Sequence, residues 1–166
     1  EFLKGGSLID EHFLNTPLHK NLPVILAFIS CWYINFWGTS THAILPYDQL
    51  LEYFPDYLQQ AQMESNGKSV NTTGEALKLN TSSIIWGGVG TNGQHAYFQL
   101  LHQGSHIVPT DFIVAKNSHH NLKNHQDALV ANCFASAQAL MQGISFEQAK
   151  DTLSTDQRSN KNTNKN

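Results

Sequence analysis

The sequence predicts an α/β fold with a parallel sheet. Three apolar runs have the length and the flanking residues of short strands, at residues 41–46, 84–86 and 107–114. Stretches with helical spacing of apolar residues follow them, at 48–63, 91–104 and 124–142. Strands that alternate with helices favour parallel pairing through crossover connections. A chain of 166 residues is long enough for one domain with a real core.

The N-terminal part is expected to hold a buried helix. Residues 1–20 are polar and contain Asn15-Thr16-Pro17, which resembles a capped helix start with proline in the first turn. The apolar run at 24–37 follows, and its length of 14 residues is shorter than the ~20 residues of a membrane span. We therefore expect a helix in the core here.

The middle of the chain pairs a helix with a long loop. Asp48 is a possible N-cap for a helix that ends near Met63, with Glu64 at its end. The 20 residues at 64–83 are mostly polar, which is long for a passive connection and typical of a functional loop.

The second half repeats the strand, turn and helix order. The run Gly87-Gly88-Val89-Gly90 predicts a tight turn before a helix capped by Thr91 or Asn92 and ending at Gly104. Gly143 should end the helix at 124–142, and a short helix should follow at 146–153. Residues 154–166 contain no apolar side chain and predict a disordered tail.

Composition excludes several classes of protein. Nine Phe, five Tyr and three Trp rule out general disorder. A net charge of −3 without a basic cluster argues against nucleic acid as a partner. Arg158 is the single arginine, so a bidentate phosphate anchor is missing. Cys31 and Cys133 lie in apolar runs and suggest reduced thiols of an intracellular protein. The chain begins at Glu1 without a leader, and we expect the true N-terminus to lie upstream.

Two residues are candidates for acid and base chemistry by position. Glu64 ends a helix beside an apolar residue, which suits a general base, although an ordinary solvated glutamate is the more frequent case. His95 lies just after the glycine turn, where α/β sheets place ligands, although a structural histidine is equally common there. The glycine turn itself is more often a tight turn than an anion site.

Metal binding and covalent catalysis are not expected. His102 and His106 are separated by Gly104, which should end their helix, and His119-His120 has no matching carboxylate or cysteine. No nucleophile elbow or Cys/His pair is present.

Two long blocks carry a resemblance to a known family. They are Gln60-Ala61-Gln62-Met63-Glu64-Ser65-Asn66-Gly67-Lys68 and the run 86–104, which contains Gly90-Thr91-Asn92-Gly93-Gln94-His95. Shorter matching segments lie at 10–13, 15–18, 32–35, 41–49 and 108–113. Over about residues 2–153 the sequence closely resembles the phosphoglucose isomerase family.

The resemblance implies a sugar-isomerase (SIS) fold of αβα sandwich type, incomplete in this chain, and interconversion of glucose 6-phosphate and fructose 6-phosphate through a cis-enediol. It implies no metal or organic cofactor and a cytoplasmic enzyme of glycolysis and gluconeogenesis. Glu64 matches the base that moves the proton between C1 and C2, and Gln60 matches a substrate-contacting glutamine. His95 matches the histidine that helps open the sugar ring from the other subunit of a homodimer. The expected partners are a sugar phosphate and a second copy, without nucleic acid or membrane.

The sequence also departs from the family. Gly87-Gly88-Val89-Gly90 stands where the family commonly has Gly-Glu-Pro-Gly. The family's phosphate loop with its lysine, its Gly-Gly-Arg segment and its late Gly-Val-Glu block with a lysine have no counterpart. We therefore expect an interior segment of a longer isomerase that is inactive or nearly inactive alone. Residues 1–153 would form part of the second sugar-isomerase domain with preceding helices, and 154–166 a disordered tail.

Two alternatives remain open. One is a non-catalytic sugar-phosphate-binding module of the same fold, which should lack the glutamate or the histidine, whereas both are present. The other is a remnant that survives as a dimerisation unit and binds no sugar.

Overall fold

The computed structural model describes residues 1–151, apart from the side chain of Lys123, and it contains a three-stranded parallel sheet. The strands are β1 (Thr41–Tyr47), β2 (Ile84–Gly87) and β3 (Thr110–Val114), in the order β2-β1-β3. Thr41 pairs with Ile84 and Ala43 pairs with Thr110. The predicted α/β class with a parallel sheet is confirmed, and β1 lies at its centre.

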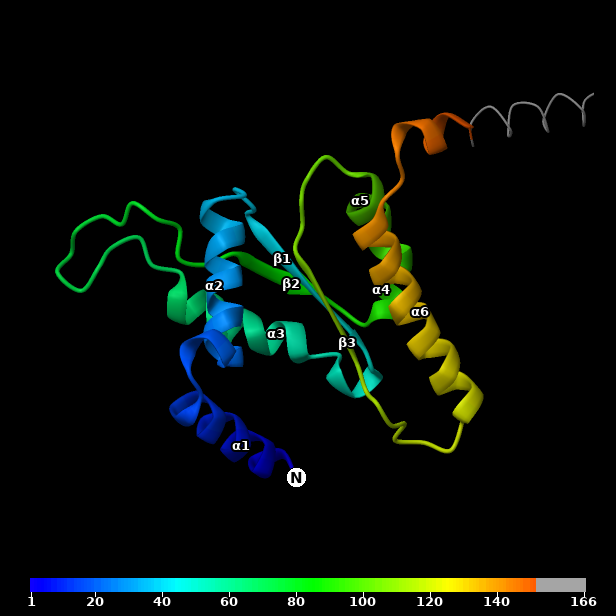
Figure 1. The fold of residues 1–166 in the computed structure, drawn as a ribbon, viewed down its shortest axis with the longest axis horizontal. Helices are drawn as coiled ribbons and strands as arrows, with labels where there is room; N and C mark the ends of the chain where they lie inside the picture. Colours follow the sequence, from blue (N-terminus) through cyan, green and yellow to red (C-terminus); the bar gives the residue numbers. More distant parts are fainter. Residues whose placement is uncertain (152–166) are drawn as a thin grey trace, which may run out of the picture.

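Helices cover both faces of this sheet. The first crossover, from β1 to β2, contains α3 (Phe54–Leu58) and the π-helix η3 (Gln59–Glu64). The second, from β2 to β3, contains α4 (Gly90–Ala96) and α5 (Phe98–Gln103), and α6 (Lys123–Gln142) follows β3. The two crossovers run in opposite directions across β1, so right-handed connections place their helices on opposite faces. Figure 1 shows α3 on one side of the strands and α4, α5 and α6 on the other.

The main core lies between β1 and the layer of α4, α5 and α6. Ala43, Leu45 and Tyr47 alternate along β1 and pack in one cluster with Phe98 and Cys133. All five side chains are buried, as expected for a central parallel strand covered by helices. The positions of α5 and α6 therefore depend on their packing against β1.

The N-terminal prediction is wrong in detail. Helix α1 (Phe2–Asn15) ends where a helix start was expected, and the single turn η1 (Leu18–Lys20) follows Pro17. The start of α2 (Leu22–Asn35) is capped by Asn21, whose side chain accepts a hydrogen bond from the Val24 N–H. The short side chain of Asn21 meets orphan N–H groups directly, so it is the cap that the geometry selects.

Helix α2 forms as predicted, but it is not buried. Only Ile34 is buried on this helix, whereas Phe28 is 67% exposed and Trp32 is 54% exposed. A helix that is apolar all round needs cover on every side, and the described residues cover one side only.

Two predicted helices are broken into shorter segments. Asp48 acts as a cap, but for the 3₁₀ turn η2 (Gln49–Leu51), and the separate helix α3 then begins at Phe54, with Pro55 in its first turn. On the other face the chain breaks at Tyr97 between α4 and α5, and Val89 rather than Thr91 or Asn92 precedes α4.

The C-terminal predictions hold within the described residues. Helix α6 ends at Gly143, whose φ of 62° favours glycine. Residues 146–151 are helical, while β3 begins at Thr110 rather than at 107. The end of the predicted last helix and the predicted tail at 154–166 lie outside the described residues.

The two cysteines are unpaired thiols in different surroundings. Cys133 is buried, and burial raises its pKa, whereas Cys31 is exposed, in contrast to the expected apolar environment. Among residues 1–151, no helix combines the length and the apolar character needed to cross a membrane.

Candidate active site

The π-helix η3 is held along the outer edge of β2. Gln59 Nε2 donates a hydrogen bond to the Ile85 carbonyl at 3.0 Å, and the Ile85 N–H donates to Met63 Sδ at 3.3 Å. These side chains satisfy backbone groups of an edge strand that no further described strand pairs with. Gln59 and Met63 therefore define the face of η3 that meets the sheet.

Gln60 and Glu64 each lie one position further around the same helix. Both side chains are exposed, and within residues 1–151 the Glu64 carboxylate has no hydrogen bond or ion pair. Short π-helical segments are rare and occur frequently at functional sites. The two predicted site residues thus share one exposed face of an element that is itself firmly docked.

The backbone at Glu64 is fixed by the residues that follow it. Lys68 Nζ donates to the Glu64 carbonyl at 2.7 Å, and the Gly67 N–H donates to the Met63 carbonyl at 2.8 Å. A Cβ on Gly67 would collide with that same Met63 carbonyl. The Thr81 hydroxyl bonds both the N–H and the carbonyl of Lys68, at 3.3 and 3.0 Å. These contacts therefore fix the backbone at the C-terminal end of η3.

The predicted long loop is held by hydrogen bonds at its base, where it joins the rest of the fold. Asn35, the last residue of α2, accepts a hydrogen bond from the Asn80 N–H at 2.8 Å and donates to the Asn80 carbonyl at 3.0 Å. Figure 1 shows the loop extending away from the sheet. The loop thus leaves and returns at a fixed point beside Glu64.

The glycine turn is explained by packing. A Cβ on Gly87, where φ is 150°, would collide with the Ile44 carbonyl, and a Cβ on Gly90 would collide with the ring of Tyr47. At Gly88 the nearest atom to a Cβ would be the Tyr97 hydroxyl at 3.6 Å, an ordinary contact. Val89 has a φ of −56°, which proline can adopt. The departures from Gly-Glu-Pro-Gly therefore fall at Gly88, which has room for a Cβ, and at Val89, whose φ suits proline.

Helix α4 is anchored by hydroxyl and amide groups. Gln94 Nε2 donates to the Tyr47 hydroxyl and to Ser136 Oγ, both at 3.1 Å. The Tyr97 hydroxyl donates to the Gly88 carbonyl at 3.5 Å. Burial, with a smaller contribution from Tyr47, raises the pKa of Tyr97, so this hydroxyl stays protonated as a donor.

His95 follows Gln94 and lies in the last turn of α4. Its side chain is exposed and has no hydrogen bond or ion pair to any residue that the structure describes. Glu64 lies at the outer edge of β2, whereas α4 lies on the face that carries α6. Within one copy, Glu64 and His95 thus lie on different layers, and no hydrogen bond or ion pair joins them among the described residues.

Two hollows of the described residues lie away from these side chains. One of about 680 Å³ is lined by Trp37, Trp86 and Tyr97 among others, and one of about 460 Å³ lies between Thr91 and α6. Neither is lined by Gln60, Glu64 or His95. A substrate at these residues would need walls from another chain or segment.

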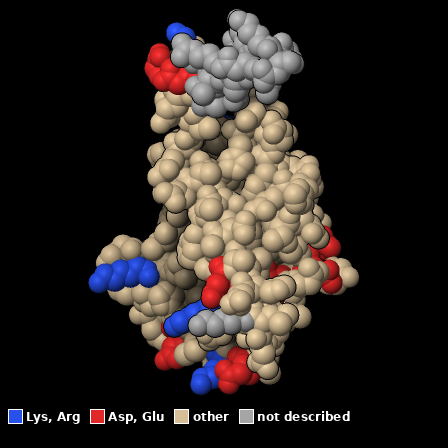
Figure 2. All heavy atoms as spheres, turned by 90° about the vertical axis from the view of Figure 1, so that its right-hand side faces the viewer, with Lys and Arg blue, Asp and Glu red and all other residues tan. Residues whose placement is uncertain are grey.

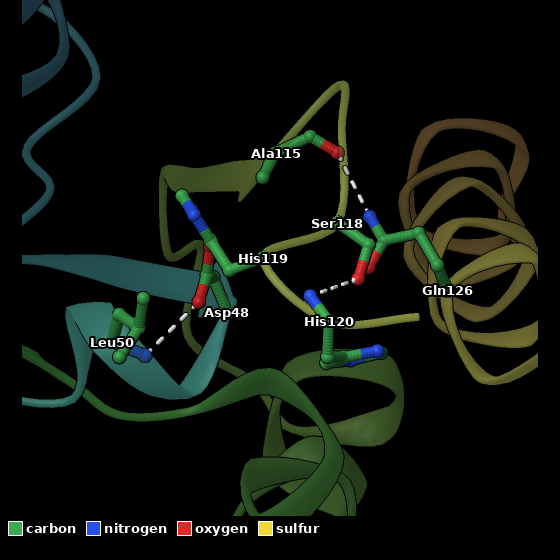
Figure 3. A network of polar contacts seen from close by, with 7 residues as sticks. All are labelled: Asp48, Leu50, Ala115, Ser118, His119, His120 and Gln126. Atoms are coloured by element: carbon green, nitrogen blue, oxygen red, sulfur yellow. Dashed lines mark hydrogen bonds and ion pairs between the residues drawn. The ribbon is translucent and has the colours of Figure 1, made fainter. Parts of the chain in front are cut away.

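A polar network at the carboxyl ends of β1 and β3 was not predicted (Figure 3). Asp48 Oδ1 accepts a hydrogen bond from the Leu50 N–H, and Asp48 Oδ2 lies 3.9 Å from His119 Nε2. The His120 N–H donates to Ser118 Oγ at 3.1 Å, and Gln126 Nε2 donates to the Ala115 carbonyl at 2.9 Å. Of these contacts only the Asp48 cap was expected from the sequence. The approach of His119 to Asp48 joins distant segments, which no local pattern indicates.

The two adjacent histidines have different local roles. His119 faces Asp48, and His120 Nδ1 accepts a hydrogen bond from the Leu122 N–H at 3.1 Å. Within residues 1–151, no group of three or more His, Cys, Asp or Glu side chains is placed to hold a metal ion.

Comparisons with known proteins identify relatives of this chain. The family described as "Phosphoglucose isomerase" matches residues 1–165. A glucose-6-phosphate isomerase of Desulforapulum autotrophicum is 61% identical over 141 residues, which are 85% of this chain and 25% of that protein. One of Ectopseudomonas mendocina is 56% identical over 92% of this chain and 28% of that protein.

Solved structures give the same result. A crystal structure of a glucose-6-phosphate isomerase from Chlamydia trachomatis superposes with a TM-score of 0.74 and 41% identity, over 87% of this chain and 29% of that one. A hypothetical protein of Thermus thermophilus shares the fold, with a TM-score of 0.61 and 21% identity over 84% of this chain and 35% of that one. The chain spans about a quarter of the length of the curated relatives it matches. The family match along nearly the whole sequence shows that the chain belongs to the phosphoglucose isomerase family.

Proposed function

We propose that this chain supplies catalytic residues to a glucose-6-phosphate isomerase, which interconverts glucose 6-phosphate and fructose 6-phosphate. The observation that carries the proposal is the state of Glu64: its backbone is held by Lys68 and by the docked π-helix, while its carboxylate is exposed and has no partner in the described residues. A base that removes and returns a proton needs a fixed position and a free carboxylate.

The reaction assigns separate tasks to the site residues. In the proposed mechanism Glu64 takes the proton from C2 of the open-chain aldose and delivers it to C1 of the cis-enediol, which yields the ketose. His95 transfers the proton that opens and closes the sugar ring. Gln60, one turn before Glu64 on the exposed face of η3, contacts the substrate. No cofactor enters these steps.

A homodimer would explain why one copy separates the two residues. In the proposal His95 reaches the Glu64 of a second copy, which agrees with its exposed position on the opposite layer. Figure 2 shows the side where α6 lies, with few charged side chains across its middle. An uncharged face is compatible with contact to another subunit.

We further propose that residues 1–153 are part of the second sugar-isomerase domain of a longer, cytoplasmic enzyme and that this chain alone is inactive or nearly so. The relatives are about four times as long as the matched region. The groups that would bind phosphate and stabilise the intermediate have no counterpart here, and one such group is often worth ~3 kcal/mol in the transition state. The unpaired Cys31 and Cys133 agree with a reducing compartment.

The decisive experiment is Glu64→Gln in the full-length protein that the gene encodes. We expect a 10²–10⁴-fold loss of isomerisation with little change in substrate binding, because the variant removes proton transfer and little volume. Exchange of the substrate's C–H protons with D₂O, followed by NMR, should be lost in parallel. Glu11→Gln on α1 is the matched control, since Glu11 is also an exposed helical glutamate.

A dimerisation remnant makes a different prediction. If Glu64→Gln changes nothing measurable and the native protein has an intact mass near 18.5 kDa, the remnant explanation replaces the enzyme. A much larger intact mass together with the loss of exchange supports the isomerase.

A further inference from the structure

Three parts of the fold meet in a closed set of hydrogen bonds. Tyr47 ends β1 and is fully buried, Gln94 lies on α4, and Ser136 lies on α6. The Tyr47 hydroxyl donates to Ser136 Oγ at 3.2 Å, and Gln94 Nε2 donates to both hydroxyl oxygens at 3.1 Å.

Each of the three hydrogen bonds has its own donor hydrogen. A glutamine amide has two N–H donors, and each has its own acceptor here. The tyrosine O–H supplies the third bond, so each pair among the three side chains is joined. Removing one partner would leave a partly buried polar group without a hydrogen bond, which lowers the stability of the fold. The network therefore favours the rotamer of Gln94 that makes both bonds.

The same helix is fixed at two further points. Gly90 lies directly against the ring of Tyr47 on β1, and Tyr97, the residue that ends α4, packs edge-on against Trp86 of β2 with ring centroids 4.9 Å apart. Together with Gln94 these contacts hold α4 against rotation about its axis and against translation along β1.

His95 has no such anchor of its own. It is the next residue on α4, about 100° further around the helix, and its exposed side chain has no hydrogen bond among the described residues. Its direction is therefore set by the orientation of α4. We propose that Gln94, through Tyr47 and Ser136, is a positioning residue for His95 in ring opening. The inference rests on the proposed function.

Ring opening can be measured apart from proton transfer between carbons. An enzyme that opens and recloses the ring interconverts the two anomers of glucose 6-phosphate, which NMR exchange spectroscopy detects. Glu64→Gln should abolish isomerisation but leave this interconversion, whereas His95→Gln should lower it. The two site residues thus have distinguishable signatures.

The test is Gln94→Met in the full-length protein, because methionine keeps the volume and removes the amide. We expect enzyme-catalysed anomer interconversion to fall about tenfold or more with the substrate Kd unchanged, since small misplacements of a catalytic group are costly. Gln99→Met is the matched control, because Gln99 on α5 is exposed and bonds only to Gln103 among the described side chains. Tyr47→Phe should give a smaller loss in the same direction, and it carries the test if Gln94→Met does not fold.

A double variant decides between positioning and a general structural effect. If Gln94 acts through His95, adding Gln94→Met to His95→Gln causes no further loss of anomer interconversion. A further loss of the full single-variant size, or a Gln94→Met protein equal to Gln99→Met, overturns the inference. Unchanged anomer interconversion in His95→Gln instead contradicts the proposed function, whatever Gln94→Met does.

Discussion

Gly90 lets α4 lie directly against the ring of Tyr47. A Cβ at this position would overlap the ring, which is itself buried and cannot move away. We predict that Gly90→Ala destabilises the protein by about 1–3 kcal/mol, the usual cost of overpacking. Gly88→Ala is the matched control, since its Cβ would meet only an ordinary contact at 3.6 Å. Urea unfolding of both variants checks the prediction, and equal midpoints would contradict it.

Single residues differ in how much the sequence could predict about them. The glycine turn was predicted, but the reasons for Gly87 and Gly90 are contacts with β1 that arise only in the folded sheet. The contact between Tyr47 and Ser136 joins positions 89 residues apart, and no local pattern indicates it. Glu64, His95 and Gln60 stay predictions, supported by their exposure and by family membership.

At the scale of elements, Asn21 joins α1 to α2. It is buried, its Nδ2 donates to the carbonyls of Phe13 and Thr16 at 2.8 and 3.2 Å, and its Oδ1 caps α2. We predict that Asn21→Ala lowers the free energy of unfolding by about 1–3 kcal/mol, because it removes a cap and leaves two partly buried carbonyls without this donor. Asn15→Ala is the control, since that side chain makes one exposed bond to the Glu11 carbonyl. Thermal unfolding of the two variants compares them, and an equal loss in both would contradict the role of Asn21.

Most elements were predicted where a local rule applies. The strand at 84–86, the cap at Asp48 and the stop at Gly143 each depend on a few adjacent residues. The break after η2 had a local signal that the prediction passed over, because Pro55 lacks the N–H that a continuous helix needs and suits the first turn of a new one. At Tyr97 the break coincides with packing of its ring on Trp86 of β2, which helical spacing does not indicate. The exposure of α2 was missed because apolar composition predicts burial without saying which chain or segment provides it.

The whole molecule has one well-covered layer and one open layer. The core cluster lies between β1 and α4 to α6, whereas α1 and α2 expose Phe2, Phe13, Phe28 and Trp32. The two cysteines sample these two environments: Cys133 belongs to the core cluster, and Cys31 lies on exposed α2. The reactivity of each thiol therefore reports how far solvent reaches into its layer.

We predict that iodoacetamide at pH 8 modifies Cys31 in the native chain and leaves Cys133 unmodified. Cys31 is exposed, whereas burial removes Cys133 from solvent and raises its pKa, so its reactive thiolate is disfavoured twice. Mass spectrometry of peptides before and after urea unfolding measures both sites, and unfolding should release Cys133 to full modification. Equal rates for the two native thiols would contradict the proposed core.

The raised pKa values of Cys133 and Tyr97 set the direction in which stability changes with pH. Burial raises the native pKa of Cys133 and of Tyr97 above their unfolded values, so both contribute stability that is present at neutral pH. The loss begins as pH rises above the ordinary pKa, about 9 for the thiol and about 10 for the phenol, and it continues until pH passes the raised native pKa. The urea midpoint should therefore fall between pH 8 and pH 10.5. Tyr97→Phe cannot ionise at this position and should show a smaller fall, because only the thiol then contributes; an unchanged slope would assign the alkaline loss to other groups.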